Sequence, residues 1–223
     1  MSKKYVVRVW DAPTRLFHWT LTICVVAAVI TAQIGGAAMD WHFKLGYTIL
    51  TLLLFRLVWG FVGGHWSRFS TFLYRPGQIL AHIQGHQDKQ LGVGHSPLGA
   101  LSVFALLGFL ALQLATGLLS DDEISASGPL VAYASSTWVS NATYYHTEIG
   151  KLILIALVTL HVLAIGLYLL KKRENLVRPM VTGDKTLDYD VVSSEDRARS
   201  RVKAAFVLAV CAILVWAFTR WLR

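Results

Sequence analysis

The sequence predicts an all-α integral membrane protein, in which four helices form a transmembrane bundle and a fifth helix crosses the membrane near the C-terminus. The 223 residues are 55% hydrophobic and only 15% charged, and a soluble domain of this length carries more charge. Five apolar runs are long enough to cross a bilayer. Lysine and arginine gather in alternate connections between these runs, as they do in multi-pass proteins.

The first predicted span covers about residues 16–34. It is longer than the apolar core of a signal peptide, so we expect it to be retained. Asp11 is expected to cap the helix, with Pro13 in the first turn, where a missing N–H costs nothing. His18 lies just inside the span, and Arg15 precedes it by three residues on the same helix face.

The second predicted span covers about residues 45–63 and follows His42 and Lys44. Arg56 comes fourteen residues after His42, within about 40° of the same helix face and near the opposite membrane surface. An arginine at that depth needs an anionic partner or a path to water. The polar connection that follows, 65–96, contains the segment RPGQILAHIQGH, which suggests a short amphipathic helix at the membrane surface. Its histidines are interpreted as surface residues, with the last of them packing at the start of the third span: His65, His82, His86 and His95.

The fourth predicted span, about residues 147–170, carries two histidines. The third span, about 97–119, has none and no charge. His146 stands at the entrance of the fourth span and His161 about two-thirds of the way through. As an α-helix, the fifteen residues between them put the imidazoles about 22 Å apart along the axis and about 60° apart around it. Both therefore face one side, and ionisable groups inside a span mark a functional site.

The predicted organisation is a four-helix core at residues 1–175, a cytoplasmic connection at 176–201 and the fifth helix at 202–223. The charged run SSEDRARSRVK before the fifth helix is interpreted as a solvated face or a mobile tail. Cys24 and Cys211 each stand alone in an apolar run, which excludes a disulfide framework and CxxC motifs and suggests small buried apolar residues. The fifth helix leaves an apolar face that suits a homodimer or a partner subunit.

The distribution of lysine and arginine predicts a cytoplasmic N-terminus. The N-terminus up to Arg15 holds four of these residues, the 65–96 connection three and the 171–203 connection nine. The loops at 35–44 and 120–148 hold one and none. With alternating spans, the three rich regions fall on one side, which is the cytoplasm by the positive-inside rule. The net charge of +8 is therefore interpreted as a topology signal and not as nucleic-acid binding.

This topology sorts the four histidines of the spans into two pairs at equal depth. His42 and His146 lie near the outer surface, and His18 and His161 lie toward the cytoplasm. A b-type haem fits best between such pairs, because imidazole is a standard axial ligand of haem iron and bundle cores hold cofactors between facing helices. Zinc favours closure by more nitrogen or sulfur ligands than two histidines provide.

Nearby cations are expected to bind the haem propionates through charge-assisted hydrogen bonds. Lys44 and Lys151 are the candidates at the outer ends of the spans. Arg15 and Arg56 are the candidates at the inner ends.

The motifs in hand resemble the bacterial cytochrome b561 family, which includes the b-type subunit of membrane-bound nickel–iron hydrogenases. The resemblance runs over about residues 5–185, and it is carried by VWDAPTRLFHW, HFKLGY with RLVWGFVG, RFSTFLYRPG, GHSPLGA and the closing LHV with NLVRPMVTG. The family implies two haems with ligands from the first, second and fourth helices. These positions match His18, His42, His146 and His161.

The resemblance implies a multi-pass protein of the bacterial inner membrane that relays electrons between quinone and a periplasmic partner: a hydrogenase, a cytochrome c or another dehydrogenase. Two alternatives stay open. Some relatives resemble superoxide oxidases, which pass an electron from superoxide to quinone, but the acidic outer residues Asp121, Asp122 and Glu123 would repel that anion. A haem-free scaffold or metal-ion carrier leaves Arg56 and the level pairing unexplained.

Overall fold

The computed structural model describes residues 3–85, 92–124 and 126–222. Five helical segments in this part of the chain are long and apolar enough to cross a membrane. They run over Ala12–Ile34, Gly36–Val62, Pro97–Leu118, Ser136–Lys171 and Ala198–Trp221. The prediction of an all-α membrane protein with five spans is therefore confirmed. The predicted surface histidine His86 lies outside the described residues.

The long helices do not all begin where the apolar runs suggest, since three of the five begin four to six residues earlier. The five long helices are α1 (Ala12–Ile34), α2 (Met39–Val62), α4 (Pro97–Leu118), α6 (Lys151–Lys171) and α8 (Ala198–Trp221). Polar first turns explain the difference for α2 and α8, since Asp40 and Arg199 are helical although neither belongs to an apolar run. Shorter helices are α3 (Pro76–Ile83), α5 (Ser136–Tyr144) and α7 (Val177–Thr182). The helix expected in the 65–96 connection is confirmed by α3.

One segment departs from the α-helical pattern at a predicted site residue. Between α5 and α6, residues Tyr145–Gly150 form a π-helical turn that contains His146. The estimate of 60° between His146 and His161 assumed a uniform α-helix, so it is wrong for the first residues of that path.

The chain forms two compact units. The first unit combines Met1–Thr20, Phe55–Phe104 and His161–Leu208, and the second combines Leu21–Leu54, Ala105–Leu160 and Ala209–Arg223. Each of the five long helices contributes residues to both units. His18 and His161 belong to the first unit, whereas His42 and His146 belong to the second.

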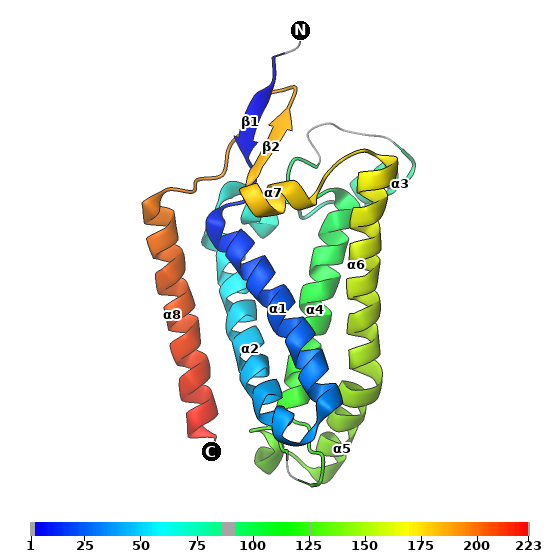
Figure 1. Cartoon of the computed structure of the whole chain (residues 1–223), viewed down its shortest axis with the longest axis vertical. Coiled ribbons are helices and arrows are strands. Elements are labelled where there is room, and N and C mark those ends of the chain that lie inside the picture. The colour runs from blue at the N-terminus through cyan, green and yellow to red at the C-terminus, as the bar shows by residue number, and fades with distance from the viewer. Residues whose placement is uncertain (1–2, 86–91, 125, 223) are drawn as a thin grey trace. The chain divides into compact units, whose positions relative to one another are not determined.

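The first unit contains a small sheet that the sequence analysis did not predict. Strands β1 (Tyr5–Arg8) and β2 (Asp184–Leu187) are antiparallel, with Tyr5 opposite Leu187 and Arg8 opposite Asp184 (Figure 1). Val7, Val9, Trp10 and Val93 form a buried apolar cluster beside it. The sheet fixes the chain just before α1 begins.

Asp11 connects the start of α1 to the end of α2 within the first unit. The carboxylate has no exposed surface. It accepts hydrogen bonds from the backbone N–H of Thr14 at 2.8 Å, from Nε1 of Trp59 at 3.1 Å and from the N–H of Gly64 at 3.0 Å. The predicted helix cap is confirmed, and the same group also holds α2.

The sequence analysis interpreted the charged run before α8 as a solvated face or a mobile tail, but one of its carboxylates is buried in ion pairs. The side chain of Asp196 is only 5% exposed and pairs with Arg8 at 2.7 Å, Arg201 at 3.0 Å and Arg15 at 3.6 Å. Two of these arginines come from the N-terminal segment, and sequence distance hid this contact. The cysteines behave as expected, since Cys24 and Cys211 are both free and buried.

Candidate functional site

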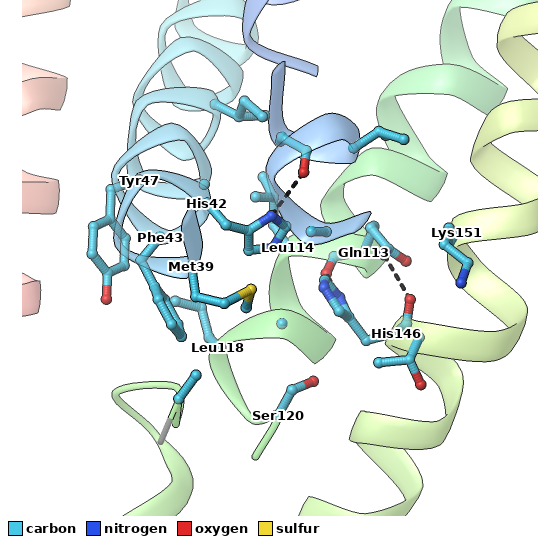
Figure 2. A pocket seen from close by; sticks show the side chains of 18 of the residues that line it. Met39, His42, Phe43, Tyr47, Gln113, Leu114, Leu118, Ser120, His146 and Lys151 are labelled. Carbon is cyan, nitrogen blue, oxygen red and sulfur yellow. Dashed lines mark hydrogen bonds between the residues drawn. The ribbon is translucent and has the colours of Figure 1, made fainter. Parts of the chain in front are cut away.

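The second unit contains a mostly apolar cavity of about 400 Å³, lined by α1, α2, α4 and the residues around the π-helical turn. This volume is within the range of about 300–1,000 Å³ for small-molecule and cofactor pockets. Figure 2 shows His42 reaching the cavity from α2 and His146 from the π-helical turn. The structure thus brings together the two histidines that the sequence assigns to the outer surface.

The spacing of these two rings suits a single metal ion between them. Their centres are 6.2 Å apart, and the ring planes are inclined by 81°. A metal–imidazole nitrogen bond is about 2.0 Å long, and C–N bonds of about 1.33 Å put a ring nitrogen about 1.1 Å from the ring centre. Two imidazoles on opposite sides of one ion therefore have centres about 6.2 Å apart. The residues present fit a haem iron.

Hydrogen bonds select the same free nitrogen in both rings. Nδ1 of His42 is 2.9 Å from the carbonyl oxygen of Ala28, and Nδ1 of His146 is 2.9 Å from that of Gln113. Because a carbonyl only accepts, Nδ1 donates in both rings and Nε2 keeps its lone pair. Bonds of this kind orient a metal-binding histidine and raise its basicity.

Two glycines leave the space that the outer site needs. A Cβ at Gly117 of α4 would lie 2.7 Å from Cε1 of His146, well inside an ordinary carbon–carbon contact of about 3.5–4.0 Å. Gly46 lines the cavity one helical turn after His42, and a Cβ there would meet no atom within 4 Å. Gly117 therefore admits the imidazole, and Gly46 keeps cavity space open.

The first unit brings together the other predicted pair. The ring centres of His18 on α1 and His161 on α6 are 6.5 Å apart, and their planes are inclined by 51°. This spacing is also close to the value of about 6.2 Å for two imidazoles on one ion. In the described ranges no three histidine, cysteine or acidic side chains gather as a metal-ligand group, so each site offers a histidine pair and not a tetrahedral set.

Arg56 carries a buried donor in the first unit. The residue is 3% exposed, and its guanidinium lies over the ring of Phe69, 4.7 Å from the ring centre. Its Nη1 has no hydrogen-bond partner among the residues that the structure describes. A buried guanidinium with an unsatisfied donor favours an anionic ligand, as the sequence analysis predicted for this residue.

The four predicted propionate partners are not equally placed. Lys151 lines the outer cavity, whereas Lys44 lies over the ring of Trp41 at 4.8 Å and is absent from the described lining. Arg15 already donates to the carbonyl oxygen of Val181 at 2.6 Å, in addition to facing Asp196. Nε of Arg15 is nevertheless, like Nη1 of Arg56, a buried donor without a hydrogen-bond partner among the described residues, so Lys151, Arg56 and Arg15 are the better candidates.

His95 is more deeply enclosed than a surface residue. Its ring packs between Trp10 and Phe72, with ring centres 4.7 and 4.4 Å away. Burial, followed by the positive charge of Arg56, lowers the pKa of His95 to about 3, so the ring is neutral. Its aromatic neighbours are distant in sequence, so the sequence indicated packing at the start of the third span but not contacts with Trp10 and Phe72.

Long apolar helices and histidine pairs at this spacing are features of a membrane-embedded cytochrome b. Residues 9–183 match the model of the prokaryotic cytochrome b561 family, so the chain belongs to that family. It is therefore a multi-pass b-type cytochrome of electron transfer, and a b-type cytochrome binds haem b. No solved structure gives a significant match.

Similar curated proteins from several bacteria are named "probable Ni/Fe-hydrogenase B-type cytochrome subunit". The chain is 25% identical to the protein of Bradyrhizobium diazoefficiens over 212 residues, which cover 80% of this chain and 85% of the relative. It is 26% identical to that of Azotobacter chroococcum over 221 residues, covering 82% and 90%. For the Rhodobacter capsulatus protein the identity is 22% over 225 residues, covering 85% of each chain.

Proposed function

We propose that this cytochrome holds two haems b, each between two histidines. His42 and His146 hold the outer haem, and His18 and His161 hold the inner one. The observation that carries the proposal is the spacing of the ring centres, 6.2 and 6.5 Å, in two separate units. Residues 1–175 then form the haem-binding core, followed by a cytoplasmic connection and by α8 (Ala198–Trp221) as an additional helix.

When bound, haem b supplies reversible one-electron chemistry. The protein groups around the sites define how it is used. With both histidines of a pair as ligands, no iron position would be left for oxygen or a substrate, which would favour electron transfer. The apolar lining of the outer cavity limits access of water. Lys151, Arg56 and Arg15 are proposed to bind propionates. Lys151 lines the outer cavity, and the two arginines each have a buried donor without a partner among the described residues, in the unit that contains His18 and His161.

We further propose that the protein connects quinone in the inner membrane with a redox partner on the periplasmic side. The N-terminus is then cytoplasmic, as the lysine and arginine distribution predicts. A hydrogenase is the first candidate partner, since the relatives are named as hydrogenase subunits. A cytochrome c or another dehydrogenase has the same requirement for a one-electron carrier.

A haem count tests the ligand assignment. Pyridine haemochrome analysis of purified protein is expected to give two haems b per chain, and a reduced spectrum should have sharp low-spin bands. His42→Leu should remove one haem and leave the signals of the other, and His161→Leu should do the reverse. A wild-type protein with one haem or none contradicts the proposal.

A second experiment tests the partner chemistry. In proteoliposomes, a reduced quinol should reduce the haems of the wild-type protein, and an oxidised quinone should reoxidise them. Rapid consumption of superoxide that depends on quinone would instead support the superoxide oxidase alternative. No exchange with quinone at all would exclude both functions.

A further inference from the structure

The π-helical turn controls the direction in which His146 points. A π-helix carries i→i+5 hydrogen bonds, so it accommodates one residue more than an α-helix over the same path. If Tyr145–Gly150 relaxed to an α-helix, the loss of that residue would rotate His146 by about 100° relative to the following part of α6. The imidazole would then leave the cavity. Something must therefore hold the turn in its wide form.

Gln113 on α4 makes a reciprocal pair of hydrogen bonds with His146. Its side-chain Nε2 donates to the backbone carbonyl of His146 at 2.9 Å, and its own backbone carbonyl accepts from Nδ1 of His146 at 2.9 Å. Figure 2 shows the two residues facing each other at the cavity wall. The amide side chain thus holds the backbone of the turn, while the backbone of Gln113 holds the ring.

Two glycines provide the space in which Gln113 and His146 make these hydrogen bonds. A Cβ at Gly150, the last residue of the turn, would overlap Oε1 of Gln113. Gly117 follows Gln113 by one turn of α4 and provides the clearance for the imidazole. The other ligand of the site is held differently, since the acceptor for His42 is the carbonyl of Ala28, a residue with no side-chain donor.

We propose that Gln113 is the positioning residue of the outer site. By holding the π-helical turn, its side chain sets the orientation of the His146 ring and the strength of the Nδ1 hydrogen bond, and through them the midpoint potential of the outer haem. The inference rests on the proposed ligation of that haem by His42 and His146. A weaker Nδ1 bond makes the imidazole less basic and so raises the potential.

The test compares three variants with the wild-type protein. Gln113→Met keeps the length of the side chain but removes the donor. Gln113→Glu keeps a donor where the buried carboxyl is protonated, which burial favours, and is measured at about pH 5. Gln78→Met removes an amide from α3, where Gln78 accepts from the backbone N–H of Arg75, and serves as the control. The measurements are haem content, the low-spin EPR signal of each haem and its potential.

We expect Gln113→Met to shift the EPR signal and raise the potential of the outer haem, identified as the one that His42→Leu removes. We also expect its haem affinity to fall about 10- to 100-fold, the usual effect of losing a ligand-orienting bond. Gln113→Glu and Gln78→Met should match the wild-type protein. Unchanged outer signals in Gln113→Met, or equal disturbance in Gln113→Glu, overturn the inference while leaving the two-haem proposal intact. A wild-type protein without the outer haem refutes the proposed function itself.

Discussion

Replacement of Gly117 by alanine tests the geometry of the outer site most directly. The added Cβ would lie 2.7 Å from Cε1 and 3.1 Å from Nδ1 of His146. Separation to an ordinary contact of about 3.5 Å requires the ring to move by about 0.8 Å away from α4. Because Gln113 lies on the same helix, this movement also stretches the 2.9 Å bond from Nδ1 to the Gln113 carbonyl beyond hydrogen-bonding distance.

The loss of a bond that orients a metal ligand lowers affinity by about 10- to 100-fold, which corresponds to about 1.4–2.8 kcal/mol. We therefore expect Gly117→Ala to bind the outer haem weakly and the inner haem normally. The assay is a titration of haem into the purified protein with a reduced-minus-oxidised spectrum for each haem.

Gly108→Ala is the matched control, because Gly108 lies on the same helix and a Cβ there meets no atom within 4 Å. Alanine at this position should stabilise α4 by about 0.5–1 kcal/mol and leave both haems bound. Wild-type affinity and spectra in Gly117→Ala would refute the placement of His146 in the outer site. Equal loss of haem in both variants would show that the effect comes from a general change in α4 and not from displacement of the His146 ring.

Three further predictions concern the first unit. Arg56→Met should weaken binding of the inner haem, because it removes the buried donor that is proposed to hold a propionate. A haem titration of the purified variant checks this, and wild-type affinity would contradict it. Asp11→Asn should cost about 1–3 kcal/mol in unfolding free energy, since an amide NH₂ would face donors such as Nε1 of Trp59, and a normal melt would contradict this. Burial opposes ionisation of Asp196, but hydrogen bonds from Arg201, from the backbone N–H of Ala12 and from Arg8 outweigh it and lower its pKa below 3.8. Its contribution is therefore present above about pH 4 and is lost as the pH falls through the lowered pKa, and Asp196→Asn should make the melting temperature less dependent on pH in that range.

The sequence was sufficient to predict the membrane-spanning helices and the grouping of the four histidines into two pairs. Apolar run length predicts helices well in membrane proteins, because the bilayer leaves few alternatives for the backbone. Span order then separates His42 and His146 from His18 and His161, and the structure places each of these pairs within one unit. Arg56 was identified for a similar reason, since a deep arginine is conspicuous in an apolar helix.

The features that the sequence did not reveal depend on contacts between distant residues. Strands of four residues such as β1 have too few positions for a clear alternating pattern, and Tyr5 pairs with Leu187 across most of the chain. The same distance separates Arg8 from Asp196. The π-helical turn left no signal either, because the residues of Tyr145–Gly150 are compatible with an ordinary α-helix.

The hydrogen bonds that orient the outer ligands are invisible in the sequence for a more general reason. Both acceptors, the carbonyls of Ala28 and Gln113, are backbone groups inside α1 and α4. A carbonyl oxygen has two lone pairs, so it can accept from an imidazole in addition to its helical partner, whatever its side chain. Such bonds require only that the helices approach at the right register, and small residues such as Gly117 allow that approach. The orientation of His42 is therefore a property of backbone packing. For His146, Gln113 adds a side-chain contact that substitution can remove.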